Sequence, residues 1–317
     1  MGCASLRGTP PAAVAPAAAL SIPAAAAVGV LADIPFHPQE LHQCGPAALA
    51  TVLGASGLQA DPLALAERVY VPGRRGSFQA ELIAATRSSG RIPYVVDGTL
   101  DALAAEVAAG RPVLVLQNLA LPSLPRWHYA VVIGIDERRV TLRSGRSATL
   151  RMSHGAFLRS WDWAGHWGFV TLRPGEWPAR PELHRWLSTL SDLEQVGQGV
   201  IAAGGYEAAV QRWPAQPLPW FALGNARYRA GQRQDARAAY EHATGLDPTF
   251  AAGWNNLAQV LGELGCTQAA REAVGRGRIV ADAAQRRTLE ATAQALPLAD
   301  QPASSTASAC SRASGNP

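Results

Sequence analysis

The sequence predicts an α+β domain followed by an all-α domain built from helical repeats. Within residues 31–175, segments with helical spacing come first and strand-like segments come later, which is the layout of an α+β fold. Further along the chain, Trp220 is followed by Trp254, a spacing of about 34 residues that is typical of a helical repeat. The total length of 317 residues is enough for two domains of ordinary size.

Composition and charge limit the classes of function. The net charge of +4 comes mostly from scattered arginines, with no basic block interleaved with aromatic residues, so we expect no nucleic-acid partner. No strongly apolar run reaches the length of about 18 residues that a membrane span needs. Four cysteines, Cys3, Cys44, Cys266 and Cys310, lie far apart without CxxC spacing. They predict neither a disulfide framework nor a zinc site, and we expect no cofactor. Cys266 is interpreted as a structural residue in a turn between helices.

Residues 1–30 are predicted to form a lipoprotein-like start and a flexible tether. Met1-Gly2-Cys3-Ala4 resembles the end of a bacterial lipoprotein signal. If that signal is genuine, a lipid on Cys3 would tether the protein to a membrane in the periplasm. If the match is due to chance, the cytoplasm is the alternative. The run of Ala, Pro and Val that follows is typical of a flexible tether.

Local signals predict the elements of the α+β domain. Pro46 suits the first position of a helix, Asp61 and Pro62 start a second helix, and Gly110 ends a fourth. The apolar run of residues 112–117 is typical of a strand that is buried on both faces. The predicted helices are 44–53, 62–69, 78–87, 100–109 and a short one from about Ser153 to Trp161, and the predicted strands are 92–96, 112–117, 128–134, 139–142, 148–152 and 166–172.

Cys44 is the candidate nucleophile. It precedes Gly45, Pro46 and an apolar helical run, so it should lie at or just before the helix N-terminus. The unpaired N–H groups and the dipole at that end favour the thiolate over the thiol. Gln39, five positions upstream, would complete an oxyanion hole together with the Cys44 N–H group. The alternative is that Cys44 is only a small buried residue at a helix start.

His128 is the candidate general base. It begins a buried strand after a loop that contains prolines, with Trp127 before it and Ala130, Val131 and Val132 after it. A general base at the rim of a rigid strand, facing the helix end that carries the nucleophile, is the arrangement that thiol catalysis requires. The alternative is a histidine that serves only as a surface residue or a structural hydrogen-bond donor.

These residues resemble the bacteriocin-processing (double-glycine) cysteine peptidases, whose fold is papain-like. The resemblance rests on Gln39, on the run from Cys44 to Leu49 and on the strand from His128 to Val132, and it covers about residues 31–175. It implies that Cys44 is the nucleophile, His128 the base and Gln39 the oxyanion donor. It also implies cleavage after small residues such as Gly-Gly.

The third catalytic position departs from this family, which usually has an aspartate one hairpin strand after the histidine. Here that place reads Leu142-Arg143-Ser144-Gly145. Ser144 can hydrogen-bond a ring nitrogen but offers no negative charge. Asp136, the nearest downstream acid, is expected in a hairpin turn that does not reach the histidine. Either a Cys–His dyad with a weak orienting group operates, or activity is low or lost.

The second domain follows a linker predicted at residues 176–188. Residues 189–286 resemble tetratricopeptide repeats, on the pattern Trp220, Leu223, Gly224, Tyr228, Gly231, Ala236, Tyr240, Ala243 and Pro248. This resemblance implies stacked helix pairs whose groove binds a peptide or a partner protein; the alternative is that the repeats only support the first domain. Residues 287–317 are rich in Ala, Ser, Pro and Thr and are predicted to be a disordered tail.

The sequence therefore predicts a papain-like cysteine peptidase domain followed by tetratricopeptide repeats. Its substrate would be a peptide or protein, cleaved by Cys44 and His128 with Gln39 and Ser144 in supporting roles. The repeat domain would recruit the substrate or a protein partner. The rival hypothesis is a catalytically weakened peptidase-like scaffold that only binds other proteins.

Overall fold

The computed structural model describes residues 29–38, 43–74, 76–296 and 310. The chain divides into two compact units, residues 1–198 and residues 199–317. The predicted sites Cys3 and Gln39 both lie outside the described residues. None of the helices in the described ranges is long and apolar enough to cross a membrane.

The first unit is built on a six-stranded antiparallel sheet with the strand order β1-β6-β2-β3-β4-β5. The strands are β1 (Ile92–Val95), β2 (Val113–Asn118), β3 (Trp127–Ile135), β4 (Arg139–Ser144), β5 (Ser147–Ser153) and β6 (Gly168–Leu172). All six residues of β2 are buried, as its continuous apolar sequence predicts. The α+β class is therefore confirmed.

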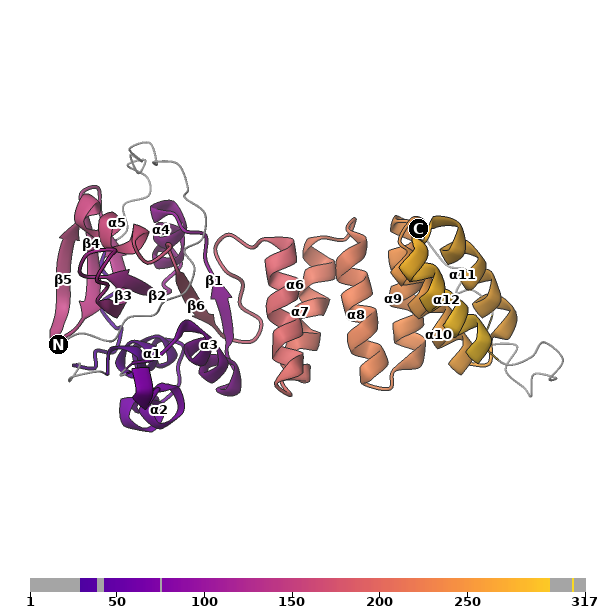
Figure 1. Cartoon of the computed structure of the whole chain (residues 1–317), viewed down its shortest axis with the longest axis horizontal. Coiled ribbons are helices and arrows are strands. Elements are labelled where there is room, and N and C mark those ends of the chain that lie inside the picture. Colours follow the sequence, from indigo (N-terminus) through magenta and orange to yellow (C-terminus); the bar gives the residue numbers. More distant parts are fainter. Residues whose placement is uncertain (1–28, 39–42, 75, 297–309, 311–317) are drawn as a thin grey trace. The chain divides into compact units, whose positions relative to one another are not determined.

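Helices cover both faces of this sheet (Figure 1). One face carries α1 (Cys44–Ala55), α2 (Pro62–Val69) and α3 (Gln79–Ser88), and the other carries α4 (Leu100–Ala108) and α5 (His154–Asp162). A short 3₁₀ turn, η2 (Pro72–Arg74), precedes α3. The sheet is thus the middle of three layers, and side chains of successive strand residues point alternately to the two outer layers.

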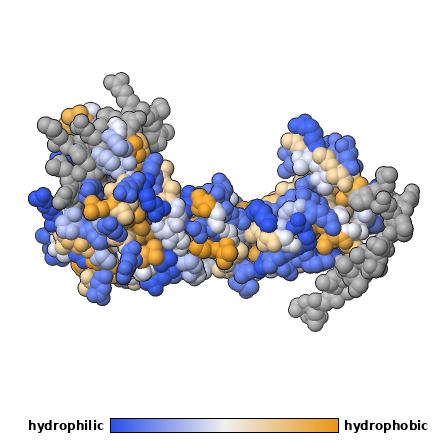
Figure 2. Space-filling view, turned by 90° about the horizontal axis from the view of Figure 1, so that it is seen from below, coloured by the Kyte–Doolittle hydropathy of each residue, from blue (hydrophilic) through white to orange (hydrophobic). Residues whose placement is uncertain are grey.

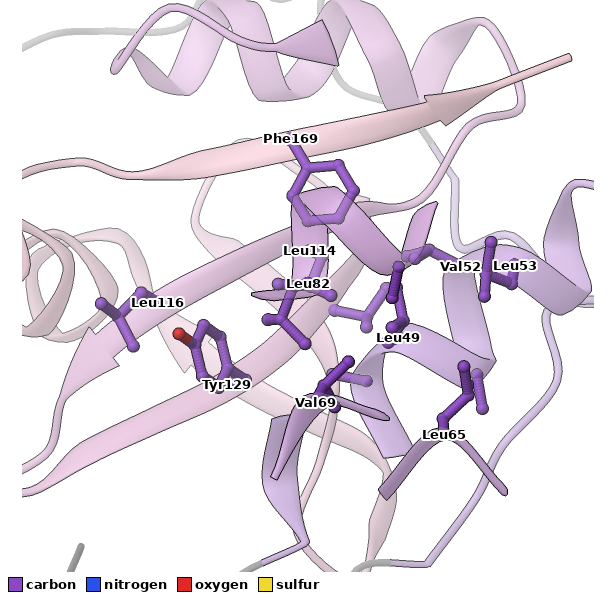
Figure 3. Packing of buried hydrophobic residues seen from close by; sticks show 14 of the residues in the cluster. Leu49, Val52, Leu53, Leu65, Val69, Leu82, Leu114, Leu116, Tyr129 and Phe169 are labelled. Carbon is purple, nitrogen blue, oxygen red and sulfur yellow. The ribbon is translucent and has the colours of Figure 1, made fainter. Parts of the chain in front are cut away.

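The core that positions α1 lies between this helix and the sheet. Leu49, Val52 and Leu53 of α1 share one cluster with Leu114 and Leu116 of β2, Tyr129, Val131 and Ile133 of β3, and Phe169 of β6 (Figure 3). These α1 residues are at most 1% exposed. Because interiors are close-packed, the cluster holds the first turn of α1 at a defined place against β3.

The predicted linker at residues 176–188 is wrong from Leu183 onward, where α6 (Leu183–Gln195) begins. The Glu182 carboxylate caps this helix by accepting hydrogen bonds from the N–H groups of its first turn. Trp186 is 2% exposed and contacts the rings of Tyr94 and Trp177. α6 therefore packs on β1 and belongs to the first unit, because burial of Trp186 outweighs the local signals for a linker.

The second unit is a stack of helices. It contains α7 (Gly199–Arg212), α8 (Pro217–Arg229), α9 (Arg233–Leu246), α10 (Ala251–Glu263), α11 (Thr267–Val280) and α12 (Ala283–Ala295). The same hydrogen bond recurs one repeat apart, because Trp220 Nε1 donates to the Pro214 carbonyl at 3.0 Å and Trp254 Nε1 donates to the Pro248 carbonyl at 2.8 Å. The predicted helical repeat is therefore confirmed.

A close helix contact explains the small residue at Gly224. A Cβ atom added there would lie 2.5 Å from the Tyr240 ring. Tyr240 is 1% exposed and its hydroxyl donates to Asn225 Oδ1 at 2.8 Å. The ring is therefore held in place and cannot move away from a methyl group at position 224. The pair joins α8 to α9 through a close contact.

Two predictions about the C-terminal region are wrong. Residues 287–295 are helical, because they belong to α12, whose Leu289 is fully buried. Against the prediction that the four cysteines form no disulfide framework, Cys266 forms a disulfide with Cys310 across 44 residues of sequence, which agrees with its interpretation as a structural residue. The spacing of the cysteines gave no sign of this pair, because α11 and α12 intervene between its two members. Apart from Leu296 and Cys310, the rest of the predicted tail lies outside the described residues.

Candidate active site

Cys44 is the half-buried first residue of α1, and it takes no part in the Cys266–Cys310 disulfide. The helix places this residue at the positive end of its dipole, and no acidic residue stands in its first turn to oppose that field. The positive end of a helix favours the thiolate form of a thiol. The prediction that Cys44 lies at a helix start is confirmed.

Gly45 allows a second segment to approach the first turn of α1. A Cβ atom added at this position would lie 2.5 Å from Ser77 Oγ. The Ser77 carbonyl in turn accepts a hydrogen bond from the Tyr129 hydroxyl at 3.2 Å. A chain of contacts therefore runs from the turn that begins with Cys44, through Ser77, to the residue next to His128 on β3.

His128 is the second residue of β3, and Ser144 is the last residue of β4. His128 Nε2 lies 2.9 Å from Ser144 Oγ, and Ser144 is 8% exposed. The structure thus brings together the two residues that the sequence placed in the base and third positions. A serine hydroxyl can donate to or accept from the imidazole, but it contributes no charge.

The electrostatic setting of His128 favours a neutral ring. Burial, with a smaller contribution from the nearby Arg126 guanidinium, lowers the pKa of His128 from its usual value of 6.5 to about 4. Both causes act against the charged form. Near neutral pH the imidazole is therefore uncharged, and it is a weaker base than a solvent-exposed histidine.

Strand alternation defines the side of the sheet on which His128 lies. Its neighbours Trp127 and Tyr129 pack in the α1 cluster, which Cys44 also borders. The His128 side chain therefore points to the other face, where its partner in register, Gln117, donates to Ser160 Oγ of α5 at 2.7 Å. Cys44 and His128 stand at the beginnings of two elements, α1 and β3, that pack against each other.

Asp136 takes no part in this site. Its carboxylate accepts hydrogen bonds from the N–H groups of Arg138 and Arg139 at 2.9 and 2.8 Å and a further one from Arg151. It thereby holds the turn between β3 and β4, which is the role that the sequence predicted for it. No group of three metal-ligating side chains occurs within the described ranges.

Gln117 is the residue near the site that sequence reasoning missed. It is 1% exposed and lies directly opposite His128 on β2. Its hydrogen bond to Ser160 fixes the surface beside the imidazole. The sequence did offer one signal, because Gln117 is a polar amide at the end of an otherwise apolar strand. A buried amide needs a hydrogen-bond partner, so such a residue indicates a polar contact nearby.

The comparisons with known proteins find two kinds of similarity. The tetratricopeptide repeat family matches residues 217–250, which include α8 and α9. No curated protein sequence matches this chain. Among solved structures, the tetratricopeptide domain of Sgt2 from Aspergillus fumigatus is 23% identical, over 41% of this chain and 94% of that one, with a TM-score of 0.33.

Two peptidase structures are also similar. A protein from Bacillus anthracis described as a C39-like peptidase is 18% identical, over 45% of this chain and 96% of that one, with a TM-score of 0.40. The peptidase domain of Streptococcus ComA, a bifunctional ABC transporter of a quorum-sensing pathway, is 19% identical, over 43% and 96%, with a TM-score of 0.35. The chain thus resembles C39-like peptidases and tetratricopeptide proteins, as its motifs predict.

Proposed function

We propose that the first unit is a cysteine peptidase in which Cys44 is the nucleophile and His128 the general base. The observation that carries this proposal is the His128–Ser144 pair on strands beside α1, the helix that begins with Cys44. A nucleophile, a base and a group that orients the base are the three parts that thiol catalysis needs. Cys44 borders the α1 face of the sheet and the His128 side chain points to the α5 face, so the proposal requires the imidazole to reach the Cys44 sulfur around the start of β3.

The hydrogen bond between His128 and Ser144 determines which ring nitrogen acts as the base. With Nε2–H donating to Ser144 Oγ, Nδ1 is the ring nitrogen that takes the proton from the Cys44 thiol. The sulfur attacks the peptide carbonyl, the C–N bond breaks, and the leaving amine takes the proton from His128. Water that is deprotonated by His128 then attacks the thioester and releases the acid and the thiol. The Cys44 N–H group and Gln39 would hold the oxyanion.

The uncharged third residue sets the resting state of this dyad. A carboxylate would stabilise an imidazolium, whereas Ser144 does not. With the pKa of His128 at about 4, the resting pair at neutral pH is a thiol beside a neutral imidazole. The proton therefore moves during attack, and catalysis should be slower than with an acid in the third position.

A digest of a peptide library tests this function. The wild-type chain is expected to cleave peptides after small residues, and Cys44→Ala is expected to abolish every product. Ser77→Ala is a matched control, because its hydroxyl lies beside the same turn without a role in the proposed chemistry. No cleavage by the wild type, or cleavage that survives in Cys44→Ala, would contradict the proposal.

A binding scaffold is the second candidate function, and the absence of charge at Ser144 favours it. In that case peptides would bind beside Cys44 without being cleaved. Peptides that bind equally to the wild type and to Cys44→Ala, with no product from either, would indicate this function.

The second unit is proposed to recruit a protein or peptide. A cleft of ≈ 580 Å³ lies between α10 and α12, and its lining includes Asn255, Gln259 and Thr292. Amides and hydroxyls of this kind can bind the backbone of an extended peptide. Peptides selected on the full chain should lose binding in Gln259→Ala, and they should keep it in Gln268→Ala, whose side chain bonds within α11.

A periplasmic location with a lipid on Cys3 is proposed from the N-terminal motif. The Cys266–Cys310 disulfide supports it, because disulfides persist mainly in oxidising compartments. Mass spectrometry of the membrane fraction should detect a diacyl adduct on Cys3. A Cys3 peptide recovered without lipid from soluble protein would contradict this location.

A further inference from the structure

A small polar cavity lies in the first unit, where the ends of α1 and α4 meet the start of β2 and the end of β6. Its volume is ≈ 160 Å³, far more than the ~10–15 Å³ that one water needs. It lies at the opposite end of β2 from Gln117 and His128. On the face seen in Figure 2, orange residues are scattered among blue ones, as is ordinary for a protein surface. This cavity, rather than a surface patch, is therefore the candidate for an unassigned site.

Thr171 contributes a buried hydroxyl that has no partner. Phe169, two positions earlier on β6, packs in the core against α1, so the Thr171 side chain lies on the same face of the sheet, and it lines the cavity. Thr171 is 6% exposed, and its Oγ1 forms no hydrogen bond with the described part of the chain. Because burial of an unpaired hydroxyl is unfavourable, this group indicates a polar occupant of the cavity.

Arg111 brings unused donors to the same cavity. Its Nε donates to Glu106 Oε2 at 2.7 Å, and the other oxygen of this buried carboxylate accepts from the Ala179 N–H group at 2.7 Å. Arg111 lines the cavity, whereas Glu106 does not. The Nη groups of Arg111 form no hydrogen bond with any described residue. The ion pair therefore holds the guanidinium in place and leaves its two terminal nitrogens for another acceptor.

Arg173 lines the cavity from the segment that follows β6. Its Nε donates to the Ser56 carbonyl at 3.2 Å, and Arg91 Nη2 donates to the same oxygen at 3.1 Å. The Nη groups of Arg173 form no hydrogen bond within the described ranges.

Glu176 is the acidic residue among the described lining residues. Its Oε2 accepts from the Arg173 backbone N–H group at 2.8 Å, and its Oε1 lies 3.7 Å from Arg173 Nε. The described lining thus carries two guanidinium groups and one carboxylate, so positive charge is in excess there.

We propose that this cavity binds a small oxyanion of the phosphate type. A guanidinium group has N–H donors and no acceptor, so two of them beside one enclosed space favour an acceptor with negative charge. The Thr171 hydroxyl would donate to a further oxygen of the same ion. Water would fill the space without balancing the charge of Arg111 and Arg173. The bound ion would join the start of β2 to the end of β6, independently of the proposed peptidase chemistry at Cys44.

Equilibrium dialysis of the full chain against radioactive phosphate tests the proposal, with the ionic strength held constant by sodium chloride. One phosphate per chain should bind, with half-saturation at about 1 mM or below. Arg173→Gln should weaken binding by about tenfold or more, because it removes a charged donor. Competition by sulfate and by glycerol 3-phosphate distinguishes a free ion from the phosphate group of a larger molecule, and either source fits the proposed site.

Two further variants separate binding from folding. Thr171→Val should weaken phosphate binding by about threefold to tenfold. Its unfolding temperature without phosphate should not fall, because the hydroxyl that it loses has no partner. Glu176→Gln should tighten binding, because it removes the negative charge while its amide oxygen can still accept from the Arg173 N–H group.

Arg159→Gln is the matched control, because Arg159 is an exposed arginine of α5 that does not line the cavity. It should bind phosphate like the wild type. Cys44→Ala should do the same, which separates this site from the peptidase function. A lack of saturable binding would show that the cavity holds only water and would overturn the proposal. Equal weakening by Arg173→Gln and Arg159→Gln would also overturn it, because binding would then reflect only the general charge of the surface.

Discussion

His128 Nε2 lies 2.9 Å from Ser144 Oγ, and this contact joins the candidate base to a hydroxyl rather than to a carboxylate. A hydroxyl can fix the orientation of the imidazole ring. It cannot stabilise the positive charge that the ring acquires when it takes a proton. The site should therefore behave as a dyad whose base is held by a hydroxyl and has a weak driving force for proton transfer.

An aspartate in place of Ser144 should make His128 a stronger base. In Ser144→Asp, a carboxylate beside Nε2 is expected to raise the pKa of His128 from about 4, because it favours the charged imidazole. The rate of peptide cleavage should rise by about tenfold or more, since general-base catalysis contributes on the order of 10²–10⁴. NMR titration of the ring and kcat against pH measure the two effects.

Ser144→Asn is the control for this substitution. The amide matches the carboxylate in shape but carries no charge, so it should leave both the pKa of His128 and the rate close to those of the wild type. An equal gain in the Asn and Asp variants would show that shape rather than charge limits the site.

The low pKa of His128 should make stability depend on pH. In the unfolded chain the ring has its usual pKa of about 6.5, whereas in the folded chain the pKa is about 4. Between these values the unfolded state binds a proton that the folded state does not. Stability should therefore fall as the pH drops through this window, by at most about 3 kcal/mol.

Urea unfolding at a series of pH values measures this effect, with His128→Gln as the reference. The variant lacks the titrating ring, so its stability should fall less than that of the wild type between about pH 6.5 and pH 4. Parallel curves for the two proteins would mean that His128 is not held neutral by the fold.

Gly224→Ala should destabilise the second unit. The added methyl would press on the buried Tyr240 ring at 2.5 Å, and overpacking of this kind costs about 1–3 kcal/mol. Gly204→Ala in α7 meets no atom within 4 Å and should stabilise the helix by about 1 kcal/mol. Thermal unfolding of the two variants should therefore shift in opposite directions, and equal shifts would contradict the contact.

Loss of the Cys266–Cys310 disulfide should lower the free energy of unfolding of the second unit. Cys310→Ser opens the bond that joins it to Cys266 across 44 residues, and the expected cost is about 2–4 kcal/mol. Thermal unfolding with and without dithiothreitol checks this. The reductant should lower the transition of the wild type but not that of the variant, and a wild type that is insensitive to reductant would mean that the bond is absent in solution.

Much of the site could be predicted because its signals are local. Pro46 after Cys44 marks a helix start, and the apolar residues after His128 mark a buried strand. The turn at Asp136 was also foreseeable, since an aspartate readily bonds the backbone two residues on. The period from Trp220 to Trp254 is also a local signal, because each repeat carries its own packing residues. This period therefore identified the repeats.

The features that the sequence did not predict depend on contacts between distant segments. Cys266 meets Cys310 only after α11 and α12 have folded, and α6 is fixed by the burial of Trp186 against Tyr94. Gln117 gains its role from its register with His128. No local pattern encodes such pairings, because each requires the fold of another part of the chain.

The most direct test of the central claim is the rate at which iodoacetamide alkylates Cys44 as the pH is varied. The Cys3→Ser protein makes Cys44 the reactive thiol, since Cys266 and Cys310 are joined. If Cys44 and His128 act as a pair, His128 accepts the thiol proton during attack, so below about pH 8.5 Cys44 should be alkylated faster than an ordinary thiol, whose pKa is about 8.5, and His128→Ala should remove this excess rate. A rate that follows the ordinary thiol at every pH, unchanged by His128→Ala, would contradict the account.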